Sequence, residues 1–240
     1  MTGIACSDFE IAAWQLVMFT PDGGIDSGAL VRRFIPAVGA EFDGEPVLLP
    51  AGQLPPEVPR AILQSADGAW RCEVAHQAVR VKWSMRPARP TTSEQVVGLS
   101  RSVLERYRES LHARVGRLAV VVTRFARHEL PGVFLATHFC EKRWLEAPLN
   151  RPEGFELHAH KRYHFPSGVE VNSWVRNKAG SVRDPSGEAK AVLVEQDLNS
   201  LSEESDQGKA FSAADTSAFF DEAHGELDGI LRLYYPEEDA

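Results

Sequence analysis

The stretch FELHAHKRYHFPSGVEVNSWVRN, residues 155–177, decides the predicted fold. Two runs rich in β-branched and aromatic residues, Phe155–Phe165 and Val169–Asn177, flank the turn sequence at 166–168. This pattern predicts an antiparallel β-hairpin. Because alternate residues of a strand share a face, the apolar residues of both runs are expected to face the core. These residues are Phe155, Leu157, Ala159, Tyr163, Phe165, Val169, Val171 and Val175.

Strands and helices are also predicted on both sides of this hairpin. A helix of about 20 residues is expected from Ser93 onwards, because apolar residues recur there with helical spacing. Ser212 and Asp215 form a capping box that opens a second helix. Residues 179–188 are expected to be a polar loop. Further strands are predicted at residues 9–20, 61–64, 70–83, 115–125 and 189–198. The chain is therefore predicted to be an α+β protein whose antiparallel sheets are backed by two long helices.

The predicted elements come in two similar series that meet near residue 114. Each series runs strand, helix, two or more strands, long helix. This order favours a duplicated α+β unit, with residues 1–114 as the first half and 115–240 as the second. No repeat is visible at the level of single residues, so the hypothesis depends on element order alone. The two halves are expected to share one compact, pseudo-duplicated unit.

Composition and charge exclude several classes of protein. The 240 residues are 43% hydrophobic and 25% charged, which excludes wholesale disorder and collagen-like repeats. No apolar run approaches the length of a membrane span, so no membrane partner is expected. The net charge of −8 argues against wholesale non-specific binding of nucleic acid. Residues 184–240 hold 15 acidic and 3 basic residues, which is typical of a solvated acidic helix or of a tail that covers a basic face.

The cysteines and the N-terminus predict a cytoplasmic protein. The three cysteines, Cys6, Cys72 and Cys140, are far apart and form no CxxC motif. The first ten residues lack the basic region and the apolar stretch of a signal peptide. A reducing compartment and idle thiols are therefore expected.

Several short motifs resemble a sporadically distributed, functionally unassigned prokaryotic family of proteins of about this length. In the first half the resemblance lies in Pro59-Arg60, Ser65–Gly68 and Val79–Trp83. In the second half it lies in Val192–Leu198, followed by an acidic loop and a helix with His224 in its middle. The resemblance implies a bacterial or archaeal cytoplasmic protein. The patchy occurrence of the family is similar to that of mobile or defence-associated genes, and the family supplies no catalytic residues.

The common catalytic motifs are incomplete in this chain. Gly208-Lys209 lacks the upstream glycine of a phosphate-binding loop. His128-Glu129 begins like a zinc-protease helix, but no second histidine follows four residues later. No GxSxG nucleophile elbow and no GxGxxG dinucleotide motif is present. These absences favour a protein without a catalytic residue or a cofactor, although they leave an enzyme open.

A metal site is one hypothesis for the histidines of the predicted hairpin. His158, His160 and His164 are separated by even intervals, so they share one face of the strand. His158 and His160 form a His-x-His pair that can converge on one ion, and a third ligand could come from His76 or His138. The alternative is a polar sheet face that uses histidine without binding a metal.

A binding surface is the other hypothesis for the same face. If residues 166–168 form the turn, Arg162 lies opposite Asn172, His160 opposite Trp174, and His158 opposite Arg176. The candidate ligand-binding residues are Arg162, Trp174, Arg176 and His160. A sheet face with arginine, histidine and an aromatic ring is a surface on which single-stranded nucleic acid can stack.

Three functions remain open from the sequence. The first is a non-enzymatic binding or adaptor protein that engages a protein partner, as an accessory to a prokaryotic defence or toxin–antitoxin-like system. The second is a binder of nucleic acid or of an anionic ligand on the basic and aromatic face. The third is a metal-dependent hydrolase at His158 and His160.

Overall fold

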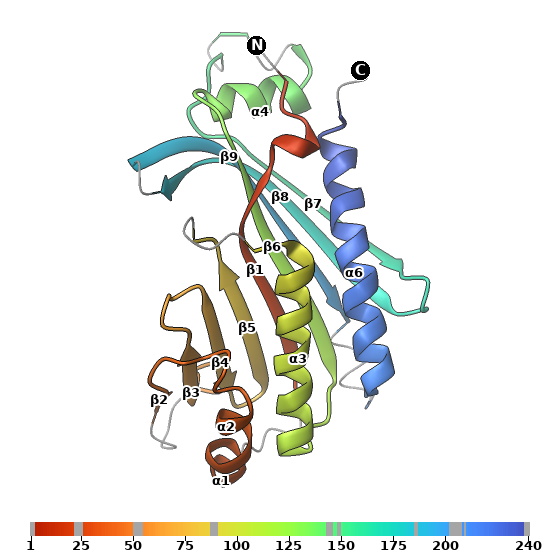
Figure 1. The fold of residues 1–240 in the computed structure, drawn as a ribbon. Helices are drawn as coiled ribbons and strands as arrows, with labels where there is room; N and C mark the ends of the chain where they lie inside the picture. The colour runs from red at the N-terminus through yellow and green to blue at the C-terminus, as the bar shows by residue number, and fades with distance from the viewer. Residues whose placement is uncertain are drawn as a thin grey trace.

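The strands of the protein form one antiparallel sheet, shown in Figure 1. This computed structural model describes residues 3–21, 26–49, 55–86, 91–142, 146–147, 150–184, 187–201, 208 and 210–237. Within these ranges nine strands lie in the order β2-β3-β4-β5-β1-β6-β9-β8-β7. Their bounds are β1 Glu10–Phe19, β2 Val47–Leu48, β3 Ala61–Gln64, β4 Trp70–Ala75, β5 Ala78–Ser84, β6 Arg117–Arg127, β7 Glu156–His164, β8 Glu170–Asp184 and β9 Gly187–Ser200. Together with the helices, this sheet confirms the predicted α+β class.

The first strands of the two predicted halves form the centre of the sheet. β1 pairs with β6 along its length, including Trp14 opposite Val122. On one side β1 is followed by β5, β4, β3 and β2, and on the other side β6 is followed by β9, β8 and β7. β6 lies between β1 and β9, the central position that the apolar residues on both faces of 118–122 predict. The division of the chain near residue 114 stays a prediction.

Two segments differ from the sequence-based expectation. Residues 70–83 were expected to be one strand, but the chain reverses at residues 76–77 and forms the two strands β4 and β5, with Ala75 opposite Ala78. Neither turn residue is glycine or proline, so the usual turn signal is missing. Residues 179–188 were expected to be a polar loop, but they extend β8 and β9, with Ser181 opposite Lys190. Backbone pairing needs no apolar side chain, so polar residues extend the ladder here.

Two helices of 19 and 22 residues lie side by side on one face of the sheet, α3 (Ser93–Leu111) and α6 (Ala213–Tyr234). Arg101 of α3 bonds to Asp221 and Ser217 of α6. The shorter helical segments are η1 Cys6–Asp8, α1 Ser27–Ala29, η2 Leu30–Phe34, α2 Ile35–Ala37 and α4 Pro131–Phe139. No helix in the described part of the chain is both long enough and apolar enough to cross a membrane. Most of the acidic loop at 202–209 lies outside the described residues.

The main core lies between the sheet and these helices. Trp70, Trp83 and Trp14 are paired across β4, β5 and β1, and all three side chains are buried. The α6 side chains Phe219 and Phe220 pack into the same core. Of the apolar hairpin residues, Phe165, Val169, Val171 and Val175 are buried, whereas Phe155, Leu157, Ala159 and Tyr163 are only half-buried. The core is therefore less complete along the outer strand β7 than along β8.

The first turn of α6 is held by the predicted capping box. The Asp215 N–H donates to Ser212 Oγ at 3.1 Å, and the Ser212 N–H donates to Asp215 Oδ2 at 2.9 Å. Ser212→Ala removes the acceptor of the first bond, so we expect the free energy of unfolding to fall by about 1 kcal/mol. Chemical denaturation measures this change. Ser212→Gly should cost only a few tenths of a kcal/mol, because glycine is itself tolerated at the cap; an equal loss in both variants would contradict this account.

Candidate functional site

The candidate binding residues lie on the face of the sheet opposite α3 and α6. The observed pairing of β7 and β8 places Arg162 opposite Asn172, His160 opposite Trp174, and His158 opposite Arg176. This confirms the register predicted from the turn at residues 166–168. The histidines and Arg162 are exposed, while Asn172, Trp174 and Arg176 are half-buried. We call the surface formed by His160, Arg162, Asn172, Trp174 and Arg176 the hairpin face.

A stacked pair of rings forms the centre of the hairpin face. The rings of His160 and Trp174 have centroids 4.2 Å apart and planes inclined by 17°. The guanidinium carbon of Arg176 lies 5.9 Å from the centroid of the Trp174 ring, within the range of a cation–π contact. A nucleotide base that stacked on Trp174 on the histidine side would therefore have to displace His160.

Asn172 contacts the side chains of both His160 and Arg162 on β7. Its Oδ1 atom accepts a hydrogen bond from Arg162 Nε at 2.9 Å and lies 3.2 Å from His160 Nε2. Its amide nitrogen reaches Asn199 Oδ1 of β9 at 3.5 Å. Asn199 in turn accepts from Arg117 of β6 at 2.8 Å and donates to Asp197 at 3.0 Å. A polar network thus crosses four neighbouring strands and holds the hairpin face in one arrangement.

The carboxylates of β9 are members of this surface that the sequence analysis did not identify. Glu195 lies opposite Arg176 and forms an ion pair with it, and Asp197 lies opposite Trp174. Both residues lie at even spacing within the strand predicted at 189–198. This spacing places Glu195 and Asp197 on one face of the strand, which the sequence alone could show. That this face adjoins the hairpin face follows only from the pairing of β9 with β8. The surface is therefore of mixed charge instead of uniformly basic.

The histidines do not assemble into a metal centre in the described residues. His158 Nε2 lies 3.4 Å from Glu156 Oε2, and His160 is stacked on Trp174. His76 lies in the turn between β4 and β5, which the strands β1, β6, β9 and β8 separate from β7. His138 is stacked on Tyr235, on the side of the sheet that α6 covers. Within the described ranges no group of three or more histidine, cysteine, aspartate or glutamate side chains could hold an ion.

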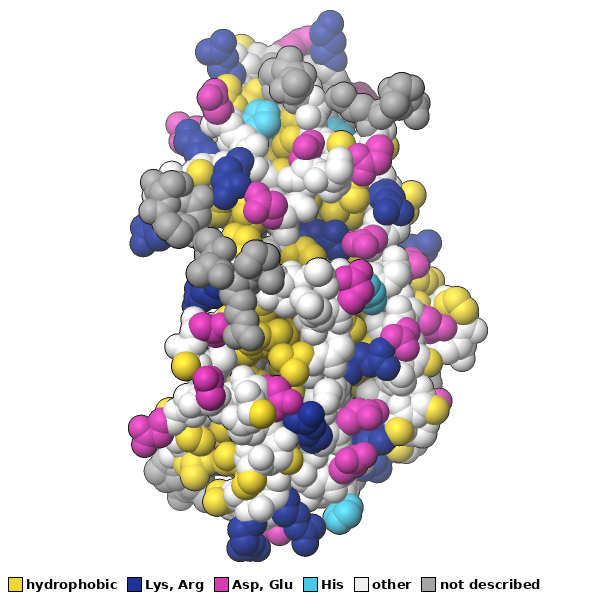
Figure 2. Space-filling model, in the orientation of Figure 1, with side chains coloured by type: hydrophobic (Ala, Val, Ile, Leu, Met, Phe, Trp, Pro, Cys, Tyr) yellow, Lys and Arg dark blue, Asp and Glu magenta, His cyan; other side chains and the backbone are white. Residues whose placement is uncertain are grey.

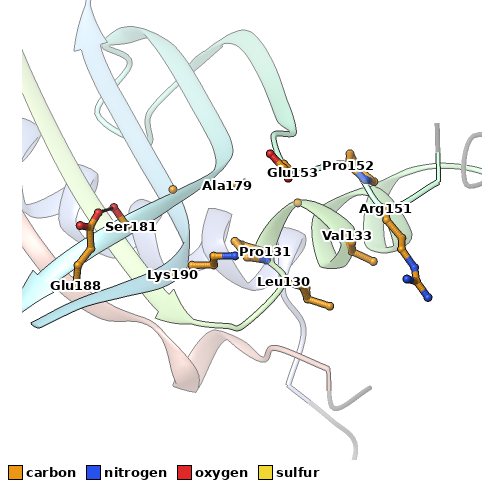
Figure 3. Close-up of a pocket in the computed structure, with 12 residues that line it drawn as sticks. Leu130, Pro131, Val133, Arg151, Pro152, Glu153, Ala179, Ser181, Glu188 and Lys190 are labelled. Carbon is orange, nitrogen blue, oxygen red and sulfur yellow. Dashed lines mark hydrogen bonds between the residues drawn. The ribbon is translucent and has the colours of Figure 1, made fainter. Parts of the chain in front are cut away.

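A separate cavity lies between the first turn of α4 and the extension of β8 and β9 (Figure 3). Its volume is about 1060 Å³, and its lining includes Lys190, Arg151, Glu153 and Glu188. Ser181 Oγ donates to Glu188 Oε1 at 2.5 Å on one wall, and Pro131 of α4 forms part of the other. The described lining contains no histidine or cysteine that could act as a base or nucleophile. None of the residues of the hairpin face contributes to it.

The thiols of Cys6 and Cys72 are in environments that keep them protonated. Burial raises the pKa of the Cys72 thiol well above its usual value, and the neighbouring Glu73 carboxylate raises it further. Burial also raises the pKa of Cys6. The thiolate is the nucleophilic form of cysteine, so neither residue is prepared for nucleophilic catalysis.

Comparison with known proteins leaves the hairpin face as the main clue to function. No protein-family model matches the chain, and no curated protein matches it either. The resemblance to a sporadic prokaryotic family therefore stays a prediction. The function proposed below is therefore inferred from the geometry of β7, β8 and β9.

Proposed function

We propose that the protein is a non-enzymatic binding protein that docks a protein partner on the hairpin face. The observation that carries the proposal is the stacked His160–Trp174 pair, flanked by Arg162 and Arg176. Tryptophan and arginine are the residues most enriched at the centres of protein interfaces. The polar network through Asn172 fixes these side chains before binding, which lowers the entropic cost of association.

The charges on this surface favour a protein over a nucleic acid. Arg176 is paired with Glu195, and Asp197 lies opposite Trp174, so β9 places two carboxylates beside the cationic and aromatic side chains of this surface. The whole chain has a net charge of −8. On the helix side, Figure 2 shows lysine and arginine side chains interspersed with aspartate and glutamate, without a large field of one sign. Affinity for nucleic acid depends on many uncompensated cations, which this arrangement does not supply.

The strand order supports a duplicated scaffold beneath the hairpin face. In each half a central strand, β1 or β6, pairs with the last of the strands that follow it in that half, β5 or β9. A long helix, α3 or α6, then follows that last strand in sequence. The proposal includes a duplication of the scaffold, in which the two halves correspond to each other and α3 corresponds to α6. Its cellular setting would be the cytoplasm of a prokaryote, as an accessory of a defence or toxin–antitoxin-like system.

Affinity capture with charge-reversal variants tests the proposal. The immobilised protein is exposed to nuclease-treated lysate of the cells that make it, and the retained proteins are quantified by mass spectrometry. We expect at least one protein to be retained by the wild type and to fall by about tenfold or more with Arg162→Glu, because the change reverses a charge on the hairpin face. Arg183→Glu is the matched control, since Arg183 is an exposed arginine of the same strand pair outside that face.

Two outcomes would contradict the proposal. The first is a set of retained proteins that is the same for the wild type and for Arg162→Glu. The second is saturable, salt-sensitive binding of labelled single-stranded DNA or RNA that Arg162→Glu abolishes, which would assign the hairpin face to nucleic acid. Circular dichroism of each variant establishes that the fold is retained.

A further inference from the structure

β7 forms one edge of the sheet along its whole length (Figure 1). It is nine residues long and pairs with β8 at every position from Glu156 to His164. At the equivalent place in the first half, the outer edge of β3 is paired with the short strand β2. Among the described residues no strand pairs with the outer edge of β7. An edge strand of this length is a template for the addition of another strand.

The register shows which backbone groups of β7 face outward. The Phe165 N–H donates to the carbonyl of Val169 at 2.9 Å, and the Phe155 carbonyl accepts from the Ala179 N–H at 2.9 Å. In an antiparallel pair, residues alternate between those that bond to the partner strand and those that face away from it. Because the pairing has no bulge, the odd-numbered residues between 155 and 165 bond to β8. The even-numbered residues, from 156 to 164, therefore direct their N–H and C=O groups away from the sheet.

The side chains of these even-numbered residues place nitrogen hydrogen-bond donors on the open face of the edge, and Arg162 is its fixed cation. His158, His160, Arg162 and His164 are exposed on it, and Glu156 is the single carboxylate of the set. An added strand would place alternate side chains directly beside this row. Opposite charges on neighbouring strands stabilise their pairing, whereas like charges destabilise it. On this face the edge therefore favours aspartate and glutamate.

The helix side of the same edge is largely apolar. Ala159 and Tyr163 of β7 and Ile230, Leu233 and Tyr234 of α6 line a cavity of about 320 Å³, whose rim includes Lys161 and Glu226. Leu233 is 83% exposed, which is the highest value among the exposed large apolar residues. Burial raises the pKa of the Tyr163 hydroxyl, and the Glu226 carboxylate raises it further, so the phenol stays neutral. On this face the edge favours apolar side chains.

We propose that β7 binds an extended segment of the partner protein as a tenth strand, in which acidic residues alternate with apolar ones. The acidic residues would lie against Arg162 and the neighbouring imidazoles, and the apolar residues would enter the cavity beside Leu233. This inference rests on the proposed function, because it states the chemistry of the partner of the same hairpin. Binding by strand addition takes its affinity from main-chain hydrogen bonds and its specificity from alternate side chains.

A second copy of the chain fits this edge less well. Antiparallel pairing of two β7 strands about His160 would place His158 of one copy opposite Arg162 of the other, and His160 opposite its own copy. In this register the Arg162 guanidinium would face an imidazole instead of a carboxylate. Charged edge strands are also a common means by which proteins avoid self-association. Arg162 thus favours an acidic segment over another β7 beside this edge.

A labelled peptide tests the inference directly. The probe is the nine-residue sequence EVDVEVDVE with blocked ends, and its binding is followed by fluorescence anisotropy. We expect saturable binding by the wild type and none of the lysine analogue KVKVKVKVK. Leu233→Asp should weaken binding by about tenfold, because it places a charge in the apolar cavity. The oligomeric state, measured by light scattering, should not change on Arg162→Ala or Arg162→Pro.

The decisive comparison is between Arg162→Ala and Arg162→Pro. Both variants remove the guanidinium, but only proline also removes the outward-facing N–H, and an edge strand tolerates proline at such a position. We expect Arg162→Ala to weaken peptide binding by a few fold and Arg162→Pro to abolish it. Equal binding by the two variants, or absence of binding by the wild type, would overturn strand addition. If the capture experiment succeeds while the peptide fails, the proposed function stands and only this inference falls. A wild-type dimer that Arg162→Pro dissociates would overturn the inference in favour of a second copy.

Discussion

Replacing Phe219 with alanine is expected to lower the free energy of unfolding by about 3–5 kcal/mol. The side chain is fully buried, in the second turn of α6. Its ring centroid lies 5.6 Å from that of Phe165, where the hairpin begins to turn, and 5.5 Å from that of Phe220. Truncation removes both contacts and leaves a cavity that the paired strands cannot collapse to fill. Urea denaturation, followed by tryptophan fluorescence, measures the loss.

Leu233→Ala is the matched control on the same helix. Leu233 is 83% exposed, so its truncation should change the free energy of unfolding by no more than about 0.5 kcal/mol. The slope of the free energy of unfolding against urea concentration should be the same in both variants, because neither substitution greatly changes the surface area that unfolding exposes. A loss below about 1 kcal/mol for Phe219→Ala would show that α6 is not packed as described.

Asp228→Asn is expected to lower the free energy of unfolding by about 3 kcal/mol. Asp228 Oδ1 accepts a hydrogen bond from a terminal nitrogen of Arg124 at 2.5 Å. The Arg124 side chain is only 7% exposed, whereas that of Asp228 is 46% exposed. Loss of the carboxylate leaves a largely buried cation without a counter-charge. Thermal and urea denaturation at neutral pH measure the effect.

Replacing the arginine of this ion pair should lower the free energy of unfolding much less than replacing the aspartate. Arg124→Met leaves Asp228 half-exposed and able to bind water, so we expect a change within about 1 kcal/mol of the wild type. The double variant, Arg124→Met with Asp228→Asn, should have the same free energy of unfolding as Arg124→Met alone, because no buried cation then lacks a counter-charge. Equal losses for the two single variants would mean that the environment of Arg124 is far more hydrated than its burial indicates.

The parts of the fold that could be predicted from the sequence depend on local rules. The register of the hairpin follows from the turn at 166–168, because side chains alternate with a period of two along each strand. The caps of α6 were likewise predictable, since Ser212 and Asp215 are three residues apart. Each of these features involves residues close together in the chain.

The parts that could not be predicted depend on the order of strands. Glu195 meets Arg176 only because β9 lies between β6 and β8. The same order gives β6 and β9 their long ladder, from Ala119 opposite Asn199 to Arg127 opposite Ala191. The turn at His76–Gln77 was missed because tertiary pairing, not a glycine or proline, determines where the chain reverses. Pairings between distant segments leave little trace in the local composition of either one.

The central position of β1 has a consequence for the order of events during synthesis. β1 precedes the other described strands of the sheet in the sequence, so both of its neighbours, β5 and β6, are made after it. Until residues 78–84 have emerged, both edges of this apolar strand lack their native partners. The second edge stays open until residues 117–127 follow. A nascent chain of this protein is therefore a natural client for chaperones that bind extended apolar segments, and β1 is the place where they would act.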